Sequence, residues 1–104
     1  MERVAFLMRL KPGCAAEYKS RHDSLWPELR AAFSAAGIGD YSIFLDEETL
    51  ALFAVQKRSD PELPRALASS PLMKKWWAHM ADLMATNPDG SPQRRDLVEV
   101  FRLD

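Results

Sequence analysis

Cysteine is almost absent from this sequence, and other signals of specialised chemistry are missing with it. Cys14 is the only cysteine, which excludes an intrachain disulfide and a structural zinc site built on several thiolates. The glycines are isolated from one another, so there is no glycine-rich phosphate loop. No apolar run is long enough to span a bilayer, and the first residues resemble a strand rather than a signal peptide. We therefore expect a cytoplasmic protein in a reducing setting.

The sequence also lacks an excess of charge of either sign. Lys and Arg together number 14 and Asp and Glu 15, so the formal net charge is −1. That balance gives no electrostatic footprint for nucleic acid or for an anionic membrane, and we expect neither as a partner. A chain of 104 residues that is 47% hydrophobic suffices for a single core, so we expect residues 1–104 to form one domain.

Hydrophobic periodicity predicts six elements in the order βαββαβ. Alternating apolar residues predict four strands, at residues 3–10, 41–46, 50–56 and 97–103. Helical spacing predicts two helical regions, at residues 13–36 and 59–85, and Ser70-Pro71 should start a new helix over residues 72–85 of the second. The first region should be broken before Pro27, because proline lacks the N–H that a helix interior needs. This order predicts an α+β fold of the ferredoxin-like type with an antiparallel sheet.

One face of this sheet should stay uncovered in a single chain. Two helical regions can cover only one face, yet residues 50–55 are apolar on both faces of their strand. An open sheet that exposes apolar side chains is an association site. We therefore expect a homodimer packed sheet to sheet.

His22 is the first candidate for chemistry, because it interrupts an apolar stripe of the first helical region. The stripe consists of Ala15, Tyr18, Leu25, Leu29 and Phe33. A titratable group in such a place is partly desolvated and can be tuned for catalysis. A lone histidine on an apolar face is more often structural, so the pattern alone leaves both interpretations open.

Aromatic residues supply further candidates. Trp76 and Trp77 are adjacent and point about 100° apart on a helix, so both are core residues only if that face is broad, and otherwise one lines a cleft. Tyr41 begins a strand, a common place for a half-buried tyrosine. His79 lies off the apolar line of its helix and should be a surface or half-buried residue. One acid/base group, two tyrosines and an aromatic wall fit proton transfer on a small neutral ligand.

Taken together, these motifs resemble the L-rhamnose mutarotase family. The resemblance is carried by Tyr18-x-x-x-His22, Leu25-Trp26-Pro27-Glu28-Leu29, Tyr41, Trp76-Trp77, Asn87-Pro88-Asp89-x-Ser91-Pro92 and the closing Glu99-Val100-Phe101. Each motif alone is weak, but their joint order and spacing over nearly the whole chain are specific. The chain departs from the family pattern at Gly90, where asparagine is expected, and at His79, where an aromatic residue is expected.

The resemblance implies a dimeric α/β-barrel of ferredoxin-like protomers. It implies an isomerase of rhamnose metabolism that interconverts the α and β anomers of L-rhamnopyranose without a metal or organic cofactor. His22 falls on the family's proton-donor position, and Tyr18, Tyr41, Trp76 and Trp77 fall on its sugar-binding positions.

Two other functions remain open from the sequence. One is a cofactor-free or haem-handling monooxygenase of the same dimeric barrel architecture, which also can use a helix histidine with tryptophan. The other is a non-catalytic sugar-binding module, since a fold does not dictate function.

Overall fold

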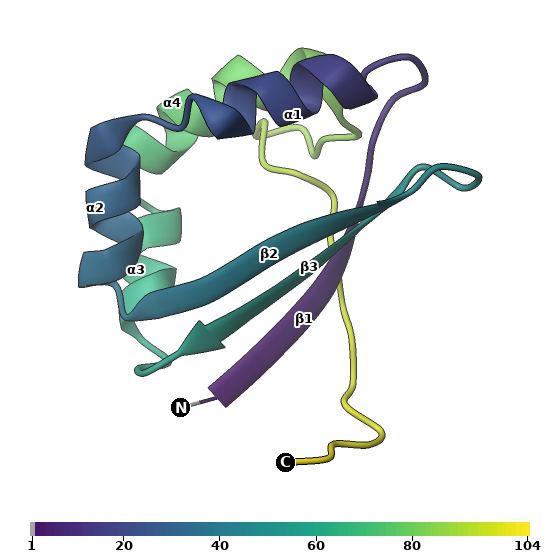
Figure 1. The fold of residues 1–104 in the computed structure, drawn as a ribbon. Helices are drawn as coiled ribbons and strands as arrows, with labels where there is room; N and C mark the ends of the chain where they lie inside the picture. The colour runs from purple at the N-terminus through teal and green to yellow at the C-terminus, as the bar shows by residue number, and fades with distance from the viewer. Residues whose placement is uncertain (1) are drawn as a thin grey trace.

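A computed structural model describes residues 2–104 as a four-stranded antiparallel sheet with helices over one face (Figure 1). The strands are β1 (Glu2–Arg9), β2 (Ile38–Asp46), β3 (Ala51–Arg58) and β4 (Arg95–Asp96). The helices are α1 (Ala15–Asp23), α2 (Pro27–Ala35), α3 (Leu63–Ala68), α4 (Pro71–Met80) and the 3₁₀ turn η1 (Ala81–Leu83). The sheet order β2-β3-β1-β4 confirms the predicted ferredoxin-like α+β fold.

The two faces of the sheet differ because side chains alternate along each strand. On the inner face, toward the helices, Phe6 of β1 is buried opposite Ala54 of β3. On the outer face, Phe53 of β3 lies opposite Phe44 of β2, and both remain exposed. The core therefore lies between the inner face and the helices.

The first helical region is interrupted where the sequence predicts it. Helix α1 ends at Asp23, and Trp26 has the extended backbone angles φ −57° and ψ 131° before Pro27 begins α2. Proline is favourable in a first helical turn because no N–H is needed there. Gly37 follows α2 with φ 74°, a left-handed conformation that suits glycine at a helix end. The break turns α2 away from the axis of α1 and leaves His22 in the last turn of α1 (Figure 1).

The second helical region is divided before Pro71, as the sequence predicts, but it ends earlier than predicted. Helix α4 ends at Met80, and η1 continues only to Leu83, whereas helical spacing predicted a continuous run to residue 85. The Ser70 hydroxyl accepts a hydrogen bond from the Met73 N–H at 3.2 Å and caps α4. No helix within residues 2–104 is long and apolar enough to cross a membrane.

The prediction of a fourth strand at residues 97–103 is wrong for the single chain. Strand β4 covers only Arg95–Asp96, which pairs with β1, and the Leu97 N–H makes a further bond to the Ala5 carbonyl at 2.9 Å. Beyond that point the chain leaves the sheet edge (Figure 1), and Val100 is 93% exposed. Alternating apolar residues favour a strand, but a strand also needs a neighbouring strand to pair with.

Candidate active site

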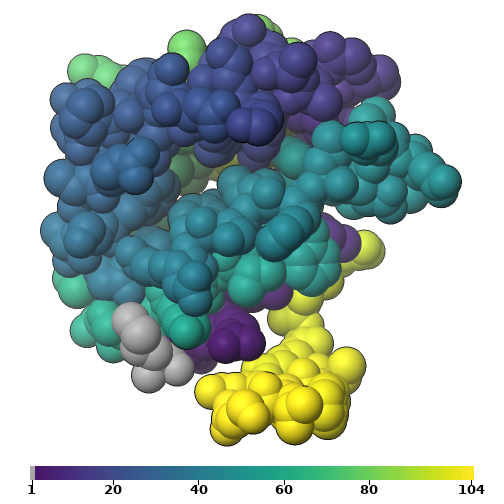
Figure 2. Space-filling model, in the orientation of Figure 1, coloured from purple at the N-terminus to yellow at the C-terminus, as the bar shows by residue number. Residues whose placement is uncertain are grey.

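A cavity of about 930 Å³ lies between the inner face of the sheet and the helices. The surface is hollowed between α1 and β2 on the side shown in Figure 2. All five residues singled out from the sequence line this cavity: Tyr18 and His22 from α1, Tyr41 from β2, and Trp76 and Trp77 from α4. Side chains that are far apart in the sequence therefore line the same cavity. The volume lies within the usual range for small-ligand pockets, about 300–1,000 Å³.

His22 lies at the wall with one ring nitrogen already engaged. Its Nδ1 is 2.9 Å from the backbone carbonyl oxygen of Tyr18, one turn earlier on α1. A carbonyl oxygen can only accept a hydrogen bond, so Nδ1 carries the proton and donates it. In the neutral ring Nε2 then has the free lone pair. The atom available to take a proton from a ligand is therefore Nε2.

The surroundings of His22 favour its neutral form. Burial lowers the pKa of the imidazole below its ordinary value, and this effect outweighs both the hydrogen bond to the Tyr18 carbonyl and the negative charge of Asp23. The rings of His22 and Tyr18 are 4.4 Å apart, and Trp76 meets His22 edge-on at 5.4 Å. Near neutral pH the site thus presents a base rather than an acid.

The two tyrosines present protonated hydroxyls to the cavity. Burial raises the pKa of Tyr18 above its ordinary value, and the nearby Tyr41 raises it further. Burial also raises the pKa of Tyr41, although the positive charges of Arg94 and Arg58 act in the opposite direction. Tyr41 is nevertheless 37% exposed as a residue, and its ring meets Phe33 edge-on at 5.7 Å. Both hydroxyls remain neutral hydrogen-bonding groups near pH 7.

The tryptophans form an aromatic wall. Trp76 is only 5% exposed and packs edge-on against Trp26 at 5.0 Å, so it is both a core residue and a cavity residue. Trp77 is half-buried, and it also lines a second space of about 300 Å³ that shares Tyr41 with the main cavity. The two alternatives left open by the sequence, core and cleft, therefore both apply to Trp76.

His79 is exposed, within the predicted choice of a surface or half-buried residue, and it does not line the cavity. Its ring nevertheless lies 5.5 Å from Trp26 and 5.5 Å from Trp76. Sequence reasoning missed one residue pair near the site, Arg21 and Asp82, whose charged groups are 2.8 Å apart. The only local signal was the spacing of Glu17 and Arg21, four residues apart on one helix.

The segment from Asn87 to Pro92 is held by its own hydrogen bonds. The Asn87 N–H donates to the Ser91 carbonyl at 2.7 Å, and its amide donates to the Ser91 hydroxyl at 3.0 Å. Asp89 accepts from the Ser91 N–H at 3.0 Å. Gly90 sits in the middle with φ 87°. Pro92 lines the main cavity, so the segment reaches the site of its own chain.

Within residues 2–104 no group of three or more His, Cys, Asp or Glu side chains is placed to hold a metal ion. The candidate site consists instead of one imidazole, two phenols and an aromatic wall.

Comparisons with known proteins give a consistent family assignment. Residues 3–103 match the family model for L-rhamnose mutarotase. An L-rhamnose mutarotase from Flavobacterium johnsoniae is 59% identical over 102 residues, which cover 98% of this chain and 95% of that protein. One from Burkholderia ambifaria is 55% identical over 104 residues and the full length of both chains.

Solved structures support the same family assignment, and they also show that more distant proteins share the fold. The crystal structure of an L-rhamnose mutarotase from Formosa agariphila superposes with a TM-score of 0.93 at 49% identity and covers all of both chains. An antibiotic biosynthesis monooxygenase matches with a TM-score of 0.63 at 11% identity, covering 96% of this chain and 99% of that one. That second likeness shows the fold alone. The chain belongs to the L-rhamnose mutarotase family.

Proposed function

We propose that this protein is an isomerase that interconverts the α and β anomers of L-rhamnopyranose, with His22 as the proton-transfer group. Membership of the family supports the reaction and the substrate. The observation that carries the mechanism is the position of His22, which lines the cavity with Nδ1 bound to the Tyr18 carbonyl and Nε2 free. The monooxygenase and the non-catalytic module are supported by the fold alone.

Anomer exchange requires the transfer of two protons. The hemiacetal opens when the anomeric hydroxyl loses a proton and the ring oxygen gains one, and it recloses on the other face of the carbonyl. Neutral His22 takes the first proton at Nε2 as the ring opens. It returns that proton to the carbonyl oxygen as the ring closes, so it serves as base and then as donor. A single acid/base group typically contributes about 10²–10⁴-fold.

The remaining site residues bind and orient the sugar. The hydroxyls of Tyr18 and Tyr41 stay protonated, so they donate hydrogen bonds to sugar oxygens or supply the proton for the ring oxygen. Trp76 and Trp77 pack against the C–H faces of the sugar and exclude water from the wall beside His22. Only protons change place in this scheme, so the reaction requires no cofactor.

Two variants test the role of His22. We expect His22→Ala to abolish most of the enzyme-catalysed exchange, which saturation-transfer NMR on the anomeric protons of L-rhamnose measures directly. His79→Ala is the matched control, because it removes an imidazole from α4 that does not line the cavity. Near wild-type exchange in His22→Ala, with the fold intact by circular dichroism, would remove His22 from the mechanism.

We also propose that two copies pack sheet to sheet into a dimeric α/β-barrel. On the outer face Leu7, Phe53 and Phe44 lie side by side across β1, β3 and β2. Phe44 is 61% and Phe53 41% exposed in the protomer. Apolar side chains that adjoin one another on an open sheet face favour association.

Sedimentation measures this dimer. We expect a dimer at micromolar concentration and a monomer for Phe53→Lys, since a charge at the centre of the patch must be desolvated on association. Arg3→Gln, on the same strand face but at the rim, is the control. A stable wild-type monomer at micromolar concentration contradicts the proposal.

We propose that residues 1–104 act as one domain in the cytoplasm, in rhamnose metabolism, with no nucleic-acid or membrane partner. The balanced charge and the single cysteine support this. Recovery of the activity in the cytosolic fraction of the source cells is the expected result.

A further inference from the structure

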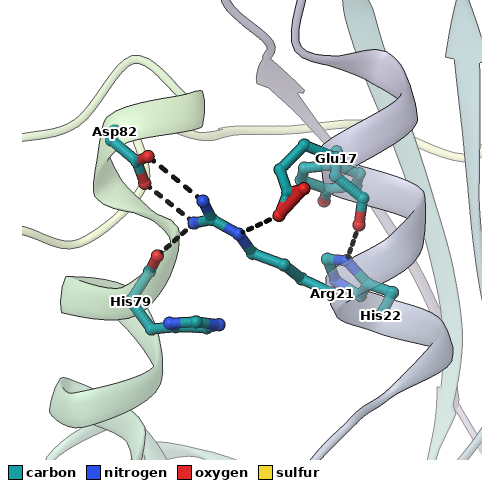
Figure 3. Close-up of polar contacts among 6 residues, drawn as sticks. Glu17, Arg21, His22, His79 and Asp82 are labelled. Carbon is teal, nitrogen blue, oxygen red and sulfur yellow. Dashed lines mark hydrogen bonds and ion pairs between the residues drawn. The ribbon is translucent and has the colours of Figure 1, made fainter.

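Arg21 links α1 to the end of α4 through several hydrogen bonds (Figure 3). Its guanidinium donates to both carboxylate oxygens of Asp82 at 2.8 and 3.2 Å and to the backbone carbonyl of His79 at 2.5 Å. It also donates to Glu17 on its own helix at 2.9 Å. Only 18% of the Arg21 side chain is exposed, whereas Asp82 is 65% exposed.

These contacts differ in kind from an ordinary surface ion pair. A two-bond fork between guanidinium and carboxylate fixes orientation as well as distance. The His79 carbonyl lies in the last turn of α4, where a cation also interacts favourably with the helix dipole. By contrast, Lys19 and Asp23 pair within α1 at 2.8 Å with 76% and 62% of their side chains exposed. That pair connects no two elements.

The link is placed directly beside the proposed chemistry. Arg21 precedes His22 in the last turns of α1, and Trp76 lies on α4, one turn before His79. The ring of His22 meets Trp76 at 5.4 Å, so the spacing between the two helices decides how closely the indole covers the imidazole. The Arg21 contacts join the same two segments, α1 and the end of α4.

We propose that Arg21 and Asp82 are positioning residues, which hold α1 against the end of α4 so that His22 stays covered by Trp76 and aimed into the cavity. This inference rests on the proposed function, because it gives His22 its catalytic role. Arg21 does not line the cavity and acts only through its neighbour.

Loosening the link should expose His22 to water. The groups that face His22 are Tyr18 and Asp23 from α1 and Trp76 from α4. Burial is the largest cause of its lowered pKa, so separation of the helices raises that pKa toward its ordinary value. Misplacement of a catalytic group by about 1 Å can cost on the order of 10²-fold in rate.

Two variants of opposite charge separate positioning from simple electrostatics. Arg21→Gln removes a positive charge near His22, and Asp82→Asn removes a negative one. Electrostatics alone shifts the His22 pKa upward in the first variant and downward in the second. Positioning predicts an upward shift in both. Arg21→Lys keeps the charge but not the fork, so we expect it to behave like Arg21→Gln. Arg65→Gln removes an exposed cation on α3 that pairs with Glu62 and lines no part of the cavity, so it is the control and should match the wild type.

The experiment measures the His22 pKa by NMR titration of the imidazole C–H signals and kcat and KM by anomer exchange. We expect Arg21→Gln and Asp82→Asn to lower kcat by about tenfold or more, with a smaller change in KM and an upward pKa shift in each. Opposite pKa shifts, or an unchanged kcat in folded variants, overturn the inference. The titration needs no activity, so a wild type that fails to exchange rhamnose anomers refutes the proposed function while leaving the helix link testable.

Discussion

The two histidines both contact the same indole, and their comparison shows which features suit an imidazole for proton transfer. His22 is 5.4 Å and His79 5.5 Å from the ring of Trp76. His22 is half-buried, lines the cavity and has Nδ1 committed to a carbonyl. His79 is exposed and lines no part of that cavity. Both histidines lie near the tryptophans, so that nearness does not distinguish them. His22 differs because it lines the cavity and its Nε2 is free to exchange a proton.

Removal of the shared indole should have the largest effect. Trp76 is buried, and truncation of a buried tryptophan typically costs about 3–5 kcal/mol. We expect Trp76→Ala to lose that much unfolding free energy in urea denaturation and to lose most anomer exchange. Trp26→Ala is the control for the His79 side, since Trp26 does not line the cavity. If both variants lose the same amount of anomer exchange at equal stability, the residues that line the cavity matter no more than those beside His79.

The pH profile distinguishes the two imidazoles next. Nε2 of His22 must be unprotonated to act as a base, so enzyme-catalysed kcat/KM should fall about tenfold per pH unit below the lowered pKa of His22. That fall lies below pH 6.5, the ordinary value. His79→Ala should leave the profile unchanged, which exchange measurements corrected for the buffer rate can check. If the low-pH fall of kcat/KM moves in His79→Ala, then that fall does not report His22 alone and the prediction is wrong.

Stability should show the smallest effect. The pKa of His22 is lowered in the folded state, so the unfolded state binds more protons below pH 6.5. The wild type therefore loses stability as the pH falls from 6.5 through the folded pKa. We expect a loss of less than about 1 kcal/mol, because the ring is only partly buried. Thermal unfolding of the wild type and of His22→Ala against pH tests this, and the variant should show a flatter dependence.

Much of the fold could be predicted because its causes are local. Pro27 interrupts the first helical region because proline lacks a backbone N–H, and alternation of apolar residues predicted the first three strands. The prediction failed for residues 97–103, because a strand forms only where a neighbour supplies hydrogen bonds. Helix α4 also ended early, at Met80, where the chain tightens into η1. Both errors concern contacts that a periodic pattern does not contain.

Some residues of the candidate site are placed by local helix spacing, and others are placed by tertiary packing. The amino-acid sequence alone shows that an imidazole interrupts an apolar helix face one turn after a tyrosine, because the spacing of a helix places His22 and Tyr18 together. That Tyr41, Trp76 and Trp77 line the same cavity depends on tertiary packing. Tertiary packing also brings Trp76 edge-on to the His22 ring and Asp82 to Arg21. Burial and cross-helix hydrogen bonds depend on which elements meet, and one element's residue pattern does not specify its neighbours.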